Sequence, residues 1–208
     1  MPLTLAQFQD FVDLKLPPLD AGVNDGGPYE FYGADQLFLY ALNLNNHVAL
    51  LTNSVAKAWM GLQIDALEIV NAIGDASFFA TALASSVDAT LDELMLEPGD
   101  ASEACNELAA AVLGRNAVAI TMIAVKLSND VVELLSGAFT KSMDIESVRL
   151  SASEPEFDAE LLVKRLSLLL TTLSLVASAH GIPYEDFVLQ EVIERQRADE
   201  TPEEVQAA

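Results

Sequence analysis

The sequence predicts an all-α protein, a helical bundle with no β-sheet. Apolar residues recur at three- and four-residue spacing along most of the chain, which is the periodicity of amphipathic helices. Apolar alternation at period two never lasts, and no Asn-Gly or Asp-Gly turn separates two strand-like segments. The 208 residues are 51% apolar, which is enough to build a buried core.

The first half is expected to hold one short and two long helices. Residues 5–14 form a short amphipathic pattern, and the Pro- and Gly-rich residues 17–33 are expected to be a loop. Leucine, alanine and valine then recur at helical spacing over residues 35–59 and again over residues 65–87. These two segments are predicted to be long helices.

Capping patterns mark the middle of the chain. Thr90 and Glu93 form a capping box that opens a short helix, and Pro98-Gly99 ends this helix. The pattern then restarts with a second possible cap at Asp100 and Glu103.

The second half repeats this order of elements. A helix is predicted to end near Leu113, and a long one covers residues 117–141. The polar residues 144–156 are expected to be a loop. Another long helix follows over residues 160–180, and a last helix runs from Pro183 toward Arg197.

The two halves are interpreted as tandem repeats. Residues 44–51 match residues 127–134 at a constant offset, with two leucines, an asparagine and a valine identical. Residues 83–88 fall opposite residues 176–181, and the polar loop between the last two long helices absorbs the larger offset. Chance similarity between two leucine-rich helices is the alternative.

The repeats are assigned to residues 1–98 and 99–198, and residues 199–208 to an acidic, disordered tail. Each repeat alone would leave an apolar face in water. We therefore expect the two repeats to pack face to face around an approximate two-fold axis, as a pseudo-dimer.

The charge of the chain restricts its partners and location. A net charge of −22 should repel phosphate backbones and anionic lipids, so neither nucleic acid nor a membrane is an expected partner. Residues 166–179 are interrupted by serine and threonine and are too short to span a bilayer. With Cys105 as the single cysteine and no secretory leader pattern, a cytoplasmic location is expected. The acidity fits a high-salt origin as well as a small acidic viral or bacterial protein.

Several segments in the same order carry a resemblance to a known family. They are LTLAQF at residues 3–8, YALNL at 40–44, IGDASFFA at 73–80, LDEL at 91–94, and, in the second half, residues 127–134 and 166–185. Together they resemble phage-type MazG-like nucleotide pyrophosphohydrolases. The resemblance implies an all-α bundle that uses Mg²⁺ to cleave nucleoside triphosphates to the monophosphate and pyrophosphate.

The family's motif places four carboxylates around one gap. A Glu-Glu-x-x-Glu run on one helix and a Glu-x-x-Asp run on the next present their side chains to the same space. Such hard oxygen ligands suit Mg²⁺, which neutralises the triphosphate and helps to activate the attacking water.

This sequence departs from the motif in both repeats. In the first repeat the motif positions are Asn46, His47 and Leu50 on one helix and Ala72 and Asp75 on the next. In the second repeat they are Asn129, Asp130, Glu133, Arg165 and Leu168. Each site is expected to be built within one repeat, so the remaining acids do not combine. Mg²⁺ binding is therefore expected to be weak or absent, with Asp130 and Glu133 as the ligands if it occurs.

Arg165 is predicted to replace the metal in the second repeat by pairing with Asp130 or Glu133. The alternative is that Arg165 reaches solvent beside Lys164. Asp130 and Glu133 could likewise be an ordinary solvated face of a helix.

Other candidate residues also have structural interpretations. Asp75 is either a vestigial ligand or a surface or capped residue. His47 has no second histidine or cysteine at ligand spacing, which favours a packed or exposed histidine. Cys105 lies in no motif and is expected to be a small buried residue rather than a nucleophile.

The leading interpretation is a MazG-like bundle with an eroded metal site and weak or no hydrolysis, which binds a nucleotide or a protein. It would be a monomeric pseudo-dimer or a homodimer. One alternative is an active Mg²⁺-dependent pyrophosphohydrolase in which Asp158 or Glu160, displaced by one helical turn, supplies a missing carboxylate. A further alternative is a purely structural bundle.

Overall fold

The computed structural model describes residues 3–16, 32–96, 105–142 and 157–198, and every regular element in these ranges is a helix. The prediction of an all-α bundle is confirmed. The helices are α1 (Leu5–Lys15), α2 (Tyr32–Trp59), α3 (Ala66–Ser85), α4 (Leu91–Leu94), α6 (Asn106–Leu113), α7 (Ala117–Ser142), α9 (Ala159–Ala179), the π-helix η1 (Tyr184–Leu189) and α10 (Gln190–Ala198).

Polar side chains define where several helices begin. Thr4 and Gln7 form a capping box at the start of α1. The Asp65 carboxylate accepts a hydrogen bond from the backbone N–H of Leu67 at the start of α3. At α4, the backbone N–H of Thr90 donates to the Glu93 carboxylate at 3.4 Å, as the capping pattern predicts. These bonds satisfy backbone groups that the first turn of a helix leaves without a partner.

Some sequence predictions differ from the structure or cannot be compared with it. Helix α2 begins at Tyr32, three residues before the predicted start and inside the segment expected to be a loop. The predicted cap at Asp100 and Glu103, the loop at 144–156 and the tail at 199–208 lie outside the described residues.

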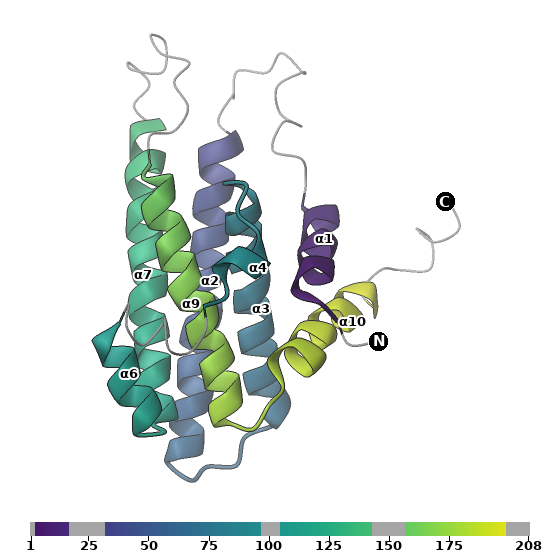
Figure 1. Cartoon of the computed structure of the whole chain (residues 1–208), viewed down its shortest axis with the longest axis vertical. Coiled ribbons are helices and arrows are strands. Elements are labelled where there is room, and N and C mark those ends of the chain that lie inside the picture. Colours follow the sequence, from purple (N-terminus) through teal and green to yellow (C-terminus); the bar gives the residue numbers. More distant parts are fainter. Residues whose placement is uncertain (1–2, 17–31, 97–104, 143–156, 199–208) are drawn as a thin grey trace.

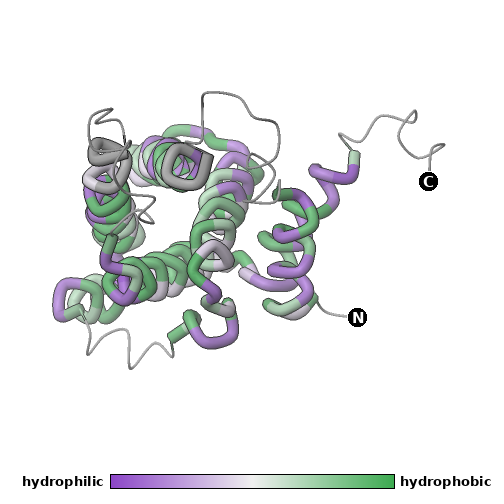
Figure 2. The backbone as a smooth tube through the Cα atoms, turned by 90° about the horizontal axis from the view of Figure 1, so that it is seen from above, coloured by the Kyte–Doolittle hydropathy of each residue, from purple (hydrophilic) through white to green (hydrophobic). Residues whose placement is uncertain are grey.

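Four long helices, α2, α3, α9 and α7, surround one core, with each helix packed against its two neighbours (Figure 2). Figure 1 shows that neighbouring helices of this ring run in opposite directions. The largest fully buried side chains include Leu44, Leu51, Ile73, Leu83, Leu135, Leu162, Leu166 and Leu169. Because these side chains come from both halves, the core belongs to the whole chain.

Several contacts join the two halves of the chain, and their arrangement as two units around a two-fold axis stays a prediction. Helix α2 packs against its counterpart α7, and the Ser128 hydroxyl donates to the Asn45 amide oxygen at 2.8 Å. These two residues occupy equivalent positions in the proposed repeats. Helix α4 crosses to α9, while η1 and α10 cross to α3. The leading helices differ, because α6 packs on α7 whereas α1 packs on α3 and α4. Duplication of the sequence itself stays a prediction.

The predicted last helix begins as a π-helix. The backbone N–H of Val188 donates to the carbonyl of Pro183, five residues earlier, at 3.2 Å. This wider turn places the buried Tyr184 hydroxyl 2.8 Å from the Ser77 hydroxyl on α3, and Ser77 donates to the carbonyl of Ile73. Burial raises the pKa of Tyr184 well above its ordinary value, so the phenol keeps its proton and donates to Ser77.

Two helices, α3 and α9, are long and apolar enough to cross a membrane by length and composition. The segment 166–179, which alone was expected to be too short to span a bilayer, lies within α9, and this helix extends from Ala159 to Ala179 close to its predicted range of 160–180. Core helices of bundles share these properties. In both cases more than half of the most apolar segment is buried, 61% in α3 and 56% in α9.

Gly74 marks the close approach of α10 to α3. A Cβ atom at this position would lie 2.5 Å from Cγ2 of Val192 and 3.4 Å from the carbonyl oxygen of Val188. We expect Gly74→Ala to lower the free energy of unfolding by about 1–3 kcal/mol, because valine has little rotamer freedom to move away. Urea denaturation measures the change.

The matched control is Gly137→Ala in α7, where an added Cβ meets nothing within 4 Å. This change should stabilise the chain by about 1 kcal/mol through helix propensity. In a Val192→Ala background, Gly74→Ala should lose most of its penalty. Equal effects of both glycine substitutions would contradict the close approach.

Candidate functional site

The motif positions of the first repeat do not share one face in the structure. Asn46 and Leu50 lie on the outer surface of α2, with Leu50 49% exposed. His47 is half-buried and points toward α3, where it meets Asp75. Ala72, one turn earlier on α3, is buried in the core. The structure therefore brings only His47 and Asp75 of this set together.

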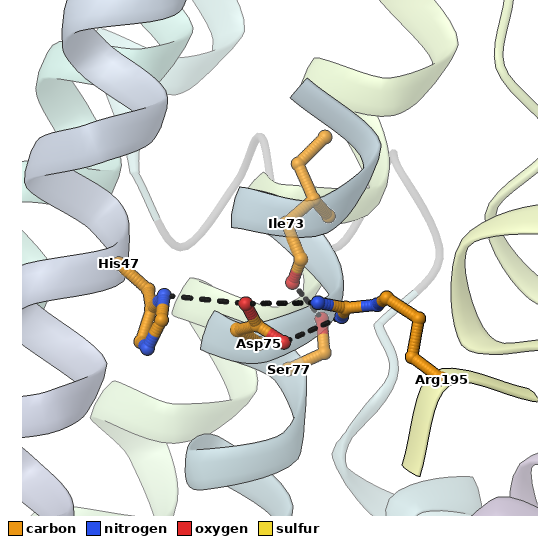
Figure 3. A network of polar contacts seen from close by, with 5 residues as sticks. All are labelled: His47, Ile73, Asp75, Ser77 and Arg195. Atoms are coloured by element: carbon orange, nitrogen blue, oxygen red, sulfur yellow. Dashed lines mark hydrogen bonds and ion pairs between the residues drawn. The ribbon is translucent and has the colours of Figure 1, made fainter. Parts of the chain in front are cut away.

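Asp75 pairs with an arginine from the C-terminal helix. Its Oδ1 lies 2.6 Å from Nη2 of Arg195, and its Oδ2 lies 3.5 Å from Nη1 (Figure 3). Both side chains are partly buried, with 23% of Asp75 and 33% of Arg195 exposed. The planar guanidinium thus meets both carboxylate oxygens, the geometry that arginine forms best with a carboxylate.

His47 lies on the other side of Asp75. Its Nδ1 is 3.5 Å from Oδ2 of Asp75, and its ring stacks on Phe79 with centroids 5.6 Å apart. Burial lowers the pKa of His47, the charge of Asp75 acts in the opposite direction, and the charge of Arg195 adds a smaller lowering. At neutral pH the imidazole is therefore uncharged, and Arg195 supplies the charge that balances Asp75.

This cluster corrects one expectation. The first-repeat site is not built within one repeat, because Arg195 comes from the second. Asp75, expected to be either a vestigial ligand or a surface or capped residue, lies in the middle of α3, is partly buried and forms an ion pair. Arg195 was not among the residues predicted for this site. Arg195 follows the buried Val192 by three residues and the buried Val188 by seven. This spacing places a cation near the apolar face of the last helix and predicts a buried acidic partner.

In the second repeat the predicted contact of Arg165 is present. Nε of Arg165 on α9 lies 3.3 Å from Oδ2 of Asp130 on α7, and about a third of each side chain is exposed. Asn129 and Glu133 are exposed, and Leu168 is half-buried. Arg165 pairs with Asp130 rather than extending into solvent beside Lys164. Whether it stands where a metal once bound stays a prediction.

The two carboxylates that could complete a displaced metal site have other partners. Asp158 caps α9, with its Oδ1 accepting a hydrogen bond from the backbone N–H of Leu161 at 2.9 Å. Glu160 pairs with Lys164 at 2.7 Å on the exposed surface of the same helix. Neither contact connects these acids to Asp130, so the geometry gives no support to the alternative in which they supply a ligand.

Within the described residues, no three histidine, cysteine, aspartate or glutamate side chains form a group that could hold a metal ion. Cys105 is half-buried just before α6. The two clusters instead balance charge, because a guanidinium faces Asp75 in the first repeat and Asp130 in the second. Chemically, such pairs can orient helices but offer no free carboxylate pair for acid–base work.

No protein-family model, curated protein or solved structure matches the chain. The resemblance to MazG-like pyrophosphohydrolases thus rests on the sequence segments alone. It enters the functional argument below as a proposal.

The His47 environment predicts opposite effects from two neighbouring substitutions. Asp75→Asn should lower the pKa of His47 further, because it removes the charge that raises it, and Arg195→Gln should raise it. NMR titration of the ring measures both. His180, whose pKa burial also lowers, is the internal control and should not change. Shifts of the same sign in both variants would contradict this arrangement.

The folded pKa of His47 lies below that of the unfolded chain, about 6.5. The unfolded chain therefore binds the proton more readily between these two values. This histidine contributes stability that is present above about pH 6.5 and is lost as the pH falls through the folded pKa.

The two arginine pairs should differ in their contribution to stability. Asp75 meets both guanidinium nitrogens in a short contact, so Asp75→Ala should lower the free energy of unfolding by about 1–3 kcal/mol. Asp130 makes a single longer contact, so Asp130→Ala should lower it by under about 1 kcal/mol. Double-mutant cycles with Arg195→Ala and Arg165→Ala isolate each pair. A larger coupling energy for the second pair would reverse this ranking.

Proposed function

We propose that the chain is a MazG-like helical bundle that has lost Mg²⁺-dependent hydrolysis and acts by binding a protein partner. The observation that carries the proposal is the pairing of Asp75 with Arg195 and of Asp130 with Arg165. Mg²⁺ gives up its water reluctantly and needs carboxylate charge to do so. A guanidinium within 3.5 Å competes directly for that charge.

Charge also argues against a nucleotide as the main ligand. A triphosphate needs cationic side chains, and the chain has only ten lysines and arginines against 32 acids. Among the residues that the structure describes, these cations form ion pairs with carboxylates: Lys57, Lys126, Lys164, Arg165 and Arg195. Binding a triphosphate there would require these pairs to break.

A protein partner fits the turn between α2 and α3. Trp59 is 78% exposed, Met60 60% and Leu62 55%, so three large apolar side chains within four positions contact water. Exposed tryptophan and methionine are typical of protein interfaces, where burial of one such side chain can dominate the binding energy. We infer that this turn contacts the partner.

The enzymatic part of the proposal is tested with mixed nucleoside triphosphates and Mg²⁺. We expect no pyrophosphate release above the protein-free control, and no sub-millimolar Mg²⁺ site by calorimetry. Nucleotides should not raise the melting temperature. Metal-dependent release of pyrophosphate that Asp130→Asn abolishes would restore the enzyme alternative.

Arg165→Glu provides the complementary test, because it adds a carboxylate beside Asp130. The variant should be less stable than the wild type without metal, and Mg²⁺ should restore part of the loss. A variant that does not respond to Mg²⁺ would argue against a former metal centre.

The binding part is tested by comparing proteins captured by the wild type and by Trp59→Ser, with Met122→Ser on α7 as the exposed control. Partners lost with Trp59→Ser alone support the assigned turn, and capture unaffected by it contradicts that assignment.

A further inference from the structure

The outer face of α2 is apolar and uncharged. Its exposed side chains follow one stripe at alternating spacings of three and four residues, namely Leu39, Leu42, Asn43, Asn46, Ala49, Leu50 and Asn53. Three of them are large leucines, which are 41–55% exposed. Residues 36–56 contain no aspartate, glutamate, lysine or arginine. In a chain of net charge −22, so long a stretch without charge needs an explanation.

The corresponding face of α7 shows what is missing from α2. There, Lys126 and Glu133 occupy the positions of Asn43 and Leu50, and Lys126 pairs with Glu107 of α6 at 3.3 Å. Helix α6 packs on α7, whereas the equivalent leading helix α1 packs on α3 and α4. Within the part of the chain that the structure describes, no helix packs on the outer face of α2 as α6 packs on α7, and this face has no charged side chain.

We propose that two copies of the chain associate through this face, with their α2 helices antiparallel and a two-fold axis at Asn46. This inference does not rest on the proposed function. It uses only the exposure, spacing and charge of α2.

The stripe is self-complementary about Asn46. An antiparallel pair with this axis places Leu42 of each copy opposite Leu50 of the other, because both lie four residues from the centre. Asn46 then faces its own equivalent, and two side-chain amides can donate and accept hydrogen bonds reciprocally. An asparagine at such a position is a known way to fix the register of paired helices.

Charge favours a second copy over a different protein. Two chains of charge −22 repel each other over most of their surfaces and can approach closely only where neither carries charge. A basic partner would instead select an acidic surface, which α2 does not offer between residues 36 and 56. The apolar stripe is therefore suited to contact with itself.

The mass of the full chain is measured by light scattering coupled to size-exclusion chromatography. The measurement covers a series of protein concentrations, at an ionic strength that screens the acidic charge. We expect twice the chain mass of 22.3 kDa. Leu42→Glu should raise the dissociation constant at least about 100-fold, because each copy then buries a charge against an apolar side chain. Met122→Glu on the equivalent face of α7, where Met122 is 53% exposed, is the matched control and should leave the mass unchanged.

The register is tested by charge rescue and by cross-linking. Adding Leu50→Lys to Leu42→Glu should restore the dimer, since the two new charges face each other only between copies. Asn46→Cys in a Cys105→Ser background should form an intermolecular disulfide under mild oxidation, because the axis brings the two positions together. Asn129→Cys, the equivalent position on α7, should not.

The proposal would be overturned if the protein has the mass of one chain at every concentration. This holds whether or not a different protein binds to the stripe. A dimer that persists in Leu42→Glu, or equal cross-linking through positions 46 and 129, would also overturn it. Circular dichroism on each variant shows whether the fold is kept. Both leucines are about half exposed, so their replacement should leave the helical content unchanged.

Discussion

The burial of α3 on almost every side is the constraint that organises this protein. Helices α2, α9, α1 and α10 all pack on it, and the small residues along its length let them approach closely. The middle of a helix in this position has little solvent-exposed surface on which to carry charge. Its single mid-helix acid, Asp75, therefore needs a counter-charge within the protein, and the ion pair with Arg195 follows from the packing of the helix.

Much of the fold could be predicted because helical periodicity and capping act locally. The long helices and the capping box at Thr90 follow from local spacing. The contact between Arg165 and Asp130 was predicted from the family resemblance, which places Arg165 opposite the remaining acids of the second repeat. The role of Arg195 could not be predicted in the same way. It depends on a crossing between segments 120 positions apart in the chain, which no local pattern encodes.

The candidate site was predicted only in part for the same reason, because local patterns do not show which distant segments meet. The family's motif placed Asn46, His47 and Leu50 in one set. Positions 46 and 47 point about 100° apart on a helix, however, and only His47 turns toward α3. Hydrophobic periodicity in the sequence also could not predict that the last helix begins as a π-helix. It depends on Tyr184 finding the Ser77 hydroxyl, a contact between buried polar groups of two distant helices.

The position of Arg195 also has a consequence for the order of events during synthesis. A ribosome releases α2 and α3 long before it reaches residue 195, so for most of translation the nascent chain holds an apolar helix with an unbalanced carboxylate. The first half cannot settle into its final packing during that interval. Completion of this fold is therefore coupled to the emergence of α10, and a chain interrupted before α10 would leave the part of α3 around Gly74 and Asp75 without its cover.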